Sequence, residues 1–225
     1  MESGINNIRD KRGIFITFEG IEGSGKSTLL YNVAAALRRT GLDPVMTREP
    51  GGTSLGVALR KVLLNPDMEN IGSMAELMLF AADRAQHVSE VILPALDSCQ
   101  IVLCDRYSDA TAAYQGYGRG IPIDVITSVD NRARGGAIPD MTVLLDLPVE
   151  EGLRRARSRN DEAPDNSESR IDEEEAAFHR KVREGYLTLA RKDPERFLVL
   201  DAMNEPDRLE ELVMDEFRSR FPDAI

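Results

Sequence analysis

The 225-residue chain lacks tryptophan, has only two cysteines and two histidines, and is poor in aromatic residues. It also lacks a long apolar run: no stretch approaches the roughly 20 apolar residues that a membrane-spanning helix needs. Basic residues are fewer than acidic ones: the chain has 28 Lys and Arg and 39 Asp and Glu, which gives a net charge of −11. This deficit argues against a broad nucleic-acid or anionic-membrane surface, since both need a basic face. Any phosphate site must therefore be locally basic.

The few cysteines and histidines form no metal-binding pattern. Cys99 and Cys104 lie in or beside one apolar segment, and His87 and His179 are distant from it in sequence. We therefore expect reduced, packed thiols. The opening segment is polar and charged, so we expect a cytoplasmic protein that binds neither membranes nor nucleic acid.

Short apolar runs alternate with longer helical patterns along the chain. This alternation predicts an α/β fold in which helices cover both faces of a five-stranded parallel sheet. We expect a polar N-terminal extension over residues 1–12 and one domain over residues 13–225. The predicted strands are Ile14–Phe18, Pro44–Thr47, Ile101–Cys104, Thr142–Asp146 and Phe197–Leu200. The predicted helices are Ser27–Arg39, Leu55–Leu64, Met74–Leu96, Ile123–Arg134, Glu150–Arg159, Glu173–Lys192 and Pro206–Phe221.

One segment breaks this alternation. Asn160–Arg170 reads NDEAPDNSESR and has almost no apolar side chain. Such a segment cannot bury a face, so we expect a mobile loop. The arginines beside it, Arg154, Arg155, Arg157, Arg159 and Arg170, form either a phosphate-binding cluster or a solvated helix face.

A phosphate-binding loop follows the first predicted strand. Gly20–Ser27 reads GIEGSGKS and matches the pattern G-x-x-x-x-G-K-[ST] in full. In this pattern backbone N–H groups converge on phosphate oxygens, Lys26 supplies a mobile positive charge, and the Ser27 hydroxyl binds Mg²⁺. The sequence thus predicts an ATP and magnesium site formed by Gly20, Ile21, Glu22, Gly23, Ser24, Gly25, Lys26, Ser27 and Thr28.

An acidic residue and an arginine end a later strand. In IVLCDRY, Asp105 can hold magnesium or orient the attacking group, and Arg106 can bind a second phosphate. A structural ion pair is the alternative. No N-K-x-D element of the GTPase type follows, which favours a phosphotransferase over a GTPase.

Further features point to an acceptor that carries a flat base. Phe80 and Arg84 lie one helical turn apart, so a ring can stack on a base while a guanidinium donates to its carbonyls. The alternative without a ligand is that Phe80 is a core residue and Arg84 is a solvated surface charge. Thr47–Thr53, TREPGGT, follows the second strand and contains Arg48; its glycines also suit a simple tight turn. Thr111, Tyr114 and Gln115 offer a hydroxyl, a phenol and an amide at helical spacing.

The order of these motifs is that of a known family. FEGIEGSGKST, TREPGGT, LFAADRAQH, DRY, AAYQGYGRG and PDMTVLLDLP, followed by an arginine-rich segment, resemble the bacterial thymidylate kinases over almost the whole chain. The resemblance implies a P-loop NTPase fold in three layers, a homodimer, and transfer of the ATP γ-phosphate to dTMP. It also implies an arginine-rich lid, here residues 154–171. The N-terminal extension and the long lid depart from the usual pattern.

The resemblance assigns roles to matching residues. Phe80 is expected to stack on thymine and Arg84 to bond its O4, with Thr111 beside the base and Tyr114 below the sugar. Arg48 and Arg106 are expected near the acceptor phosphate, and Asp105 near magnesium and the transferred phosphoryl group.

Two features of the loop and the lid refine this assignment. Glu22 places a carboxylate inside an anion-binding loop, which is costly unless it faces a cation or a sugar hydroxyl. The loop has no arginine, so the lid must supply one, and Arg157 and Arg170 are the leading candidates. With Lys26, Asp105 and Arg106 they complete the expected catalytic set. The rival hypotheses are a P-loop kinase for another monophosphate or a nucleoside, and a nucleotide-binding switch.

Overall fold

The computed structural model describes residues 12–66, 68, 71–162, 171 and 174–224. Its centre is a five-stranded sheet with the order β2-β3-β1-β4-β5, in which all paired neighbours are parallel. The strands are β1 (Ile14–Glu19), β2 (Val45–Arg48), β3 (Ile101–Asp105), β4 (Met141–Asp146) and β5 (Phe197–Asp201). The five predicted strands are therefore confirmed within one residue at each end.

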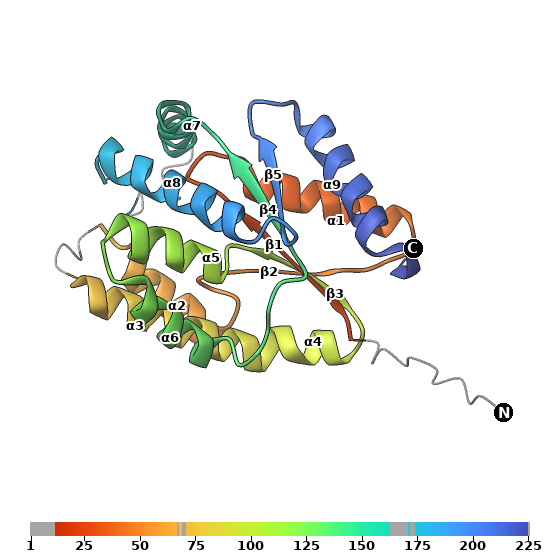
Figure 1. Ribbon diagram of the computed structural model, residues 1–225, viewed down its shortest axis with the longest axis horizontal. Coiled ribbons are helices and arrows are strands. Elements are labelled where there is room, and N and C mark those ends of the chain that lie inside the picture. Colours follow the sequence, from red (N-terminus) through yellow and green to blue (C-terminus); the bar gives the residue numbers. More distant parts are fainter. Residues whose placement is uncertain (1–11, 67, 69–70, 163–170, 172–173, 225) are drawn as a thin grey trace.

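Helices cover both faces of the sheet (Figure 1). On one face α1 (Lys26–Arg39) packs against α9 (Pro206–Arg220); on the other, α8 (Ala176–Lys192) packs against β4 and β5. The remaining α-helices are α2 (Ser54–Leu64), α3 (Ser73–His87), α4 (Leu93–Asp97), α5 (Ser108–Thr111), α6 (Ile123–Ala133) and α7 (Val149–Glu162). This is the predicted arrangement of helices around a parallel sheet.

The main core lies where β1 and its neighbours meet α1. Ile16, Phe18, Leu103 and Val143 of the strands are buried against Leu29, Val33 and Leu37 of the helix. Strands that are buried on both faces carry continuous apolar runs, as expected for a parallel sheet. This packing fixes the carboxyl ends of the strands, and with them the loops that carry the candidate site.

The helical segments differ from the predictions at three places. The expected helix Met74–Leu96 is continuous but consists of α3, a π-helical stretch Val88–Ile92 and α4. A further segment, α5 with the π-helical stretch Ala112–Gly118, was not predicted as an element. Helix α7 continues to Glu162, so the expected loop is wrong at its first three residues, and residues 163–170 lie outside the described residues.

The two thiols also differ from each other. Cys104 is buried in β3, as expected for a packed thiol, and burial raises the pKa of its thiol well above the usual value. Cys99 is exposed in a turn with a positive φ of 58°, so the expectation that it packs is wrong. Within the described residues, no helix is both long and apolar enough to cross a membrane.

Candidate active site

A cavity of about 790 Å³ opens where β1, β2 and β3 end, and its walls carry most of the predicted site residues. The predicted residues that line it are Glu22, Gly23, Lys26, Ser27, Arg48, Phe80, Arg84, Asp105, Arg106, Thr111, Tyr114 and Gln115. Gly20, Ile21, Ser24, Gly25 and Thr28 belong to the loop but are not among the lining residues. The carboxyl edge of a parallel sheet is where ligands usually bind.

The loop between β1 and α1 has the backbone of a phosphate-binding turn. Gly20 and Gly23 have φ angles of 140° and 69°, and a Cβ on Gly23 would lie 2.3 Å from the carbonyl oxygen of Gly152. No side chain caps α1, whose N-cap is Gly25. The N–H groups at the start of the helix therefore stay available for an anion.

Lys26 lies folded onto this loop. Its Nζ donates to the carbonyl oxygen of Ile21 at 2.7 Å and to Ser24 Oγ at 3.3 Å. Burial, together with the charge of Arg106, lowers the pKa of Lys26 to about 8 against the opposing effect of nearby acids. Buried phosphate oxygens would favour its charged form, so a bound nucleotide would be expected to draw the ammonium group away from the loop.

Ser27 and Asp105 form the contact that joins α1 to the end of β3. The Ser27 hydroxyl donates a short hydrogen bond to Asp105 Oδ2. Among the described residues no group of three or more His, Cys, Asp or Glu could form a protein-only metal cage. A hydroxyl with one carboxylate suits Mg²⁺, which keeps several waters and takes its other ligands from substrate phosphates.

Arg106 links the phosphate-binding loop to Tyr114 of the helical segment after β3. Its backbone has a φ of 68°, unusual for a residue with a side chain, and its N–H donates to Phe18. Nη1 donates to the Gly20 carbonyl at 2.9 Å, Nη2 donates to Glu22 Oε1 at 2.8 Å, and the guanidinium lies 5.2 Å from the Tyr114 ring centroid. A strained backbone at such a position is typical of functional sites.

Glu22 faces this cation, which was one of the two environments expected for it. Oε1 also accepts a hydrogen bond from the Tyr114 hydroxyl at 2.6 Å. Burial by itself would raise the pKa of Glu22, but Arg106, His179, Lys26 and the Tyr114 hydroxyl together outweigh it and hold the pKa well below its usual range. The carboxylate therefore stays ionised and anchors Arg106 beside the phosphate-binding loop.

A group of cationic side chains lines another part of the cavity. The sequence analysis missed two of them. Arg60 and Lys61 of α2 line the cavity together with Arg48. Burial lowers the pKa of Arg60 to about 10, and repulsion from Arg48 and Arg106 adds to the effect. Unbalanced positive charge of this kind suits a bound phosphate. The sequence carries no motif for Arg60, because it lies mid-helix, seven positions after Thr53.

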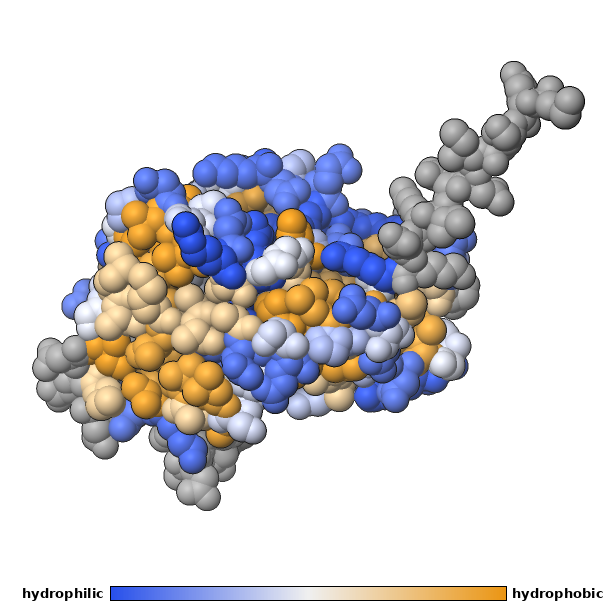
Figure 2. Space-filling model, turned by 90° about the horizontal axis from the view of Figure 1, so that it is seen from below, coloured by the Kyte–Doolittle hydropathy of each residue, from blue (hydrophilic) through white to orange (hydrophobic). Residues whose placement is uncertain are grey.

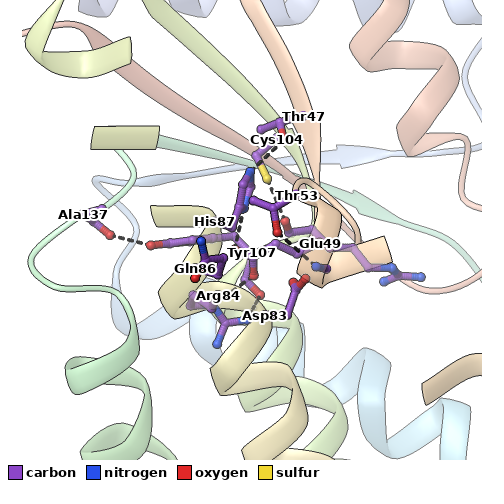
Figure 3. Close-up of polar contacts among 12 residues, drawn as sticks. Thr47, Glu49, Thr53, Asp83, Arg84, Gln86, His87, Cys104, Tyr107 and Ala137 are labelled. Atoms are coloured by element: carbon purple, nitrogen blue, oxygen red, sulfur yellow. Dashed lines mark hydrogen bonds and ion pairs between the residues drawn. The ribbon is translucent and has the colours of Figure 1, made fainter. Parts of the chain in front are cut away.

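The candidate base pocket is formed by Phe80, Arg84 and Thr111. Phe80 is half-buried and lines the cavity, whereas Arg84 is only 1% exposed. The alternative in which Arg84 is a solvated surface charge is therefore wrong. Figure 3 shows its guanidinium among side chains from the loop after β2 and from the end of β3.

Arg84 is held by four hydrogen bonds. Nε donates to Glu49 at 3.0 Å and Nη1 to Asp130 at 2.8 Å. Nη2 donates to the Tyr107 carbonyl at 3.1 Å and to Thr111 at 2.9 Å. Arginine has five N–H donors, so within the described part of the chain one N–H on Nη1 is left for a ligand.

The lid arginines have different positions. Arg157 is exposed on α7 and is not among the lining residues, and Arg170 lies outside the described residues. Arg154 and Arg155 both bind Glu151 on their own helix, at 2.7 Å. Ile171 lines the cavity, so the end of the lid segment reaches the site.

Glu19, the last residue of β1, is a buried acid that the sequence analysis missed. Its oxygens accept the backbone N–H of Tyr107 at 2.7 Å and the hydroxyl of Tyr186 at 2.8 Å. Burial, and then the charge of Asp109, raises the pKa of Glu19 to about 7. The signal in the sequence was an acid at the end of an apolar strand, immediately before the phosphate-binding loop.

Comparison with known proteins identifies the family. The family model described as Thymidylate kinase matches residues 18–213. The chain belongs to the thymidylate kinase family. The thymidylate kinase of Desulfovibrio desulfuricans is 53% identical over 195 residues, which cover 86% of this chain and 90% of the relative. That of Nitratidesulfovibrio vulgaris is 52% identical over 207 residues, which cover 92% and 96%.

A solved structure agrees with the thymidylate kinase assignment. The crystal structure of thymidylate kinase from Ehrlichia chaffeensis has a TM-score of 0.74 and 31% sequence identity, and the match covers 92% of this chain and 99% of that one. The predicted resemblance and the P-loop NTPase fold are therefore confirmed. The chain is a phosphotransferase of the thymidylate kinase family.

Proposed function

We propose that this chain transfers the γ-phosphate of ATP to dTMP, producing ADP and dTDP on the route to dTTP. One observation carries the proposal most directly: a single cavity joins the phosphate-binding loop to a pocket with an aromatic ring and a guanidinium. The family membership and the names of the relatives support the same reaction. A nucleoside kinase or a kinase of another monophosphate is not favoured.

The donor side is built from the loop and two metal-binding side chains. The backbone N–H groups of Gly20–Thr28 would hold the ATP phosphates, and Lys26 would move onto their oxygens. Ser27 and Asp105 would hold Mg²⁺, which supplies charge neutralisation on the phosphates when bound. The loop and the start of α1 would fix the direction of the phosphates.

The acceptor side orients dTMP against that donor. Phe80 would stack on the thymine ring, and the remaining Nη1–H of Arg84 would donate to the carbonyl at position 4. Thr111 and Gln115 would lie at the edge of the base and Tyr114 below the sugar. Arg48, Arg60 and Arg106 would hold the acceptor phosphate near the bound ATP, so that attack is in line.

The lid would supply further positive charge at the reacting phosphoryl group. The phosphate-binding loop has no arginine, and Arg106 is already paired with Glu22. Lys26 and the lid arginines remain as sources of charge, with Arg157 and Arg170 the leading candidates. Such contacts contribute roughly 10³–10⁵ in rate in related P-loop systems.

We also propose a cytoplasmic homodimer. Figure 2 shows apolar residues gathered on the face where α3 and α6 lie in Figure 1. The exposed large apolar side chains of these two helices are Met74, Met78 and Ile123. A second copy of the chain would remove this surface from water, as closed symmetric dimers do.

An assay of ADP release with a panel of acceptors tests the proposed reaction. Purified protein is given ATP and Mg²⁺ with dTMP, dUMP, dCMP, dAMP, dGMP or thymidine. Strong preference for dTMP is expected. Preference for another monophosphate or for thymidine would favour the alternative kinases, and ATP turnover independent of any acceptor would favour a switch.

A further inference from the structure

His87 forms a buried chain of contacts that the proposed reaction does not use. It is the last residue of α3, three positions after Arg84, and its side chain is fully buried. Nδ1 lies 2.9 Å from Glu49 Oε1, and because a carboxylate accepts only, the ring nitrogen is the donor. The other ring nitrogen lies 2.6 Å from the Thr47 hydroxyl.

Glu49 connects this histidine to the base pocket. One of its oxygens binds His87 and the other accepts from Nε of Arg84 at 3.0 Å. Both partners and Glu49 itself are buried, so losing one of these contacts is costly for the carboxylate. Figure 3 shows these side chains pointing toward one another between α3 and the loop after β2.

The same histidine shapes the loop after β2. A Cβ on Gly52 would lie 2.5 Å from two atoms of the His87 ring, so the loop backbone rests directly on the imidazole. Asp83, also on α3, accepts the N–H of Gly51 at 3.2 Å. The TREPGGT and DRAQH segments therefore form one rigid unit, in which α3 holds both the loop and the arginine that lines the cavity.

We infer that His87 is a positioning residue for recognition of the acceptor base. The imidazole, fixed by Thr47, holds the Glu49 carboxylate in the orientation that directs the guanidinium of Arg84. The one remaining Nη1–H then stays aimed at a carbonyl at position 4 of the base. The inference rests on the proposed function, because it assigns the base contact of that site to Arg84.

The test compares two acceptors whose bases differ at position 4 and in the proton on N3. dTMP carries a carbonyl at position 4 and 5-methyl-dCMP carries an amino group, which cannot accept from Arg84. His87→Gln and Thr47→Val disturb the contact chain at two points, and Thr47→Ser keeps the hydroxyl. Ile92→Val is the control. Ile92 is as fully buried as His87 and lies in the π-helical stretch that follows α3, but it takes no part in this chain of contacts.

His87→Gln is expected to raise the KM for dTMP about tenfold, the loss that one charged hydrogen bond represents. Its kcat and its KM for ATP should stay within about twofold of the wild type, because the donor side is untouched. The ratio of kcat/KM for dTMP to kcat/KM for 5-methyl-dCMP should fall by the same factor by which the KM for dTMP rises. Thr47→Val should show the same pattern more weakly, and Thr47→Ser and Ile92→Val should keep the wild-type preference.

Two results would overturn the inference. One is an unchanged preference in both His87→Gln and Thr47→Val; the other is equal loss with both acceptors and with ATP, which indicates a role in the fold alone. If His87→Gln does not fold, Thr47→Val against Thr47→Ser decides the question. Failure of the wild-type protein to phosphorylate dTMP would instead refute the proposed function, which the same assay measures separately.

Discussion

Oε2 of Glu22 lies 3.3 Å from Nδ1 of His179, in a contact buried between the phosphate-binding loop and α8. Neither atom has a hydrogen-bond partner among the described residues. The other oxygen, Oε1, receives both Arg106 and Tyr114. One oxygen of Glu22 therefore faces His179 without a hydrogen bond, and the other binds both Arg106 and Tyr114.

Changing Glu22→Gln should weaken the acceptor side without unfolding the protein. The amide keeps the shape but loses the charge that anchors Arg106, so kcat/KM for dTMP should fall about tenfold or more. The KM for ATP should change little. Steady-state kinetics check this, with Glu216→Gln as the control because Glu216 pairs with Arg220 on α9. Wild-type kinetics in Glu22→Gln would remove the anchor role.

Lys26→Ala and Asp105→Asn should each lower kcat by about 10²–10³ or more, because both groups act where charge develops. Ser27→Ala should raise the Mg²⁺ concentration needed for half-maximal rate, since it removes one of the two proposed metal ligands. Removing Mg²⁺ with a chelator should abolish turnover in every variant. Circular dichroism checks the fold. A folded Lys26→Ala or Asp105→Asn variant with near-normal activity would exclude that residue from the mechanism.

Single replacement of Arg155, Arg157, Arg159 and Arg170 by alanine should identify at least one strong loss of kcat. The loss is expected to reach roughly 10³ with little change in dTMP binding, because the contact forms only in the transition state. Arg155 is the weakest candidate, since its side chain binds Glu151 and the Ala202 carbonyl. If all four variants keep near-wild-type kcat, the charge must come from Lys26, Arg106 and magnesium.

Because Arg84 is buried, its replacement should affect the stability of the protein as well as its kinetics. Arg84→Ala would remove the proposed base contact. It would also leave the buried Glu49 without its arginine and Asp130 with only the longer contact to Arg134, at a cost of about 3–5 kcal/mol of stability. Arg84→Lys keeps the charge and should fold better, yet still raise the KM for dTMP with little change for ATP. Thermal unfolding and kinetics on both variants separate the effects. A lower ATP affinity as the only effect would place the pocket elsewhere.

The sequence predicted the sheet well because strand burial follows directly from apolar runs. Helical spacing also placed Phe80 and Arg84 on one face, and both residues line the cavity. The hydrogen bonds of Arg84 could not be predicted, because Glu49, Asp130 and Thr111 come from three other segments. Helical spacing was expected for Thr111, Tyr114 and Gln115, but the extent of the segment over residues 108–118 was not predicted, because it carries glycines at 116 and 118 and no amphipathic apolar pattern.

The raised pKa of Glu19 could not be predicted from the sequence either, because it depends on how deeply the folded protein buries the side chain. The pKa rises from its ordinary 4.5 to about 7 in the folded protein. The folded state therefore holds a proton that the unfolded chain releases, and the stabilisation is complete below pH 4.5. It is lost as the pH rises to about 7, by at most about 3 kcal/mol.

Glu19→Gln removes this titration while it keeps the hydrogen bonds. The amide oxygen can accept the Tyr107 N–H, and the amide nitrogen can donate to the Tyr186 hydroxyl, which also accepts. The free energy of unfolding of wild type minus that of Glu19→Gln should fall as the pH rises from 4.5 to 7, then level off. Asp83, whose pKa burial raises to about 6, contributes equally to both proteins and cancels in the difference. Urea unfolding at steps of half a pH unit measures the curve. A difference that stays flat over this range, or rises, would mean that Glu19 is ionised in the folded protein and that its two donors outweigh its burial.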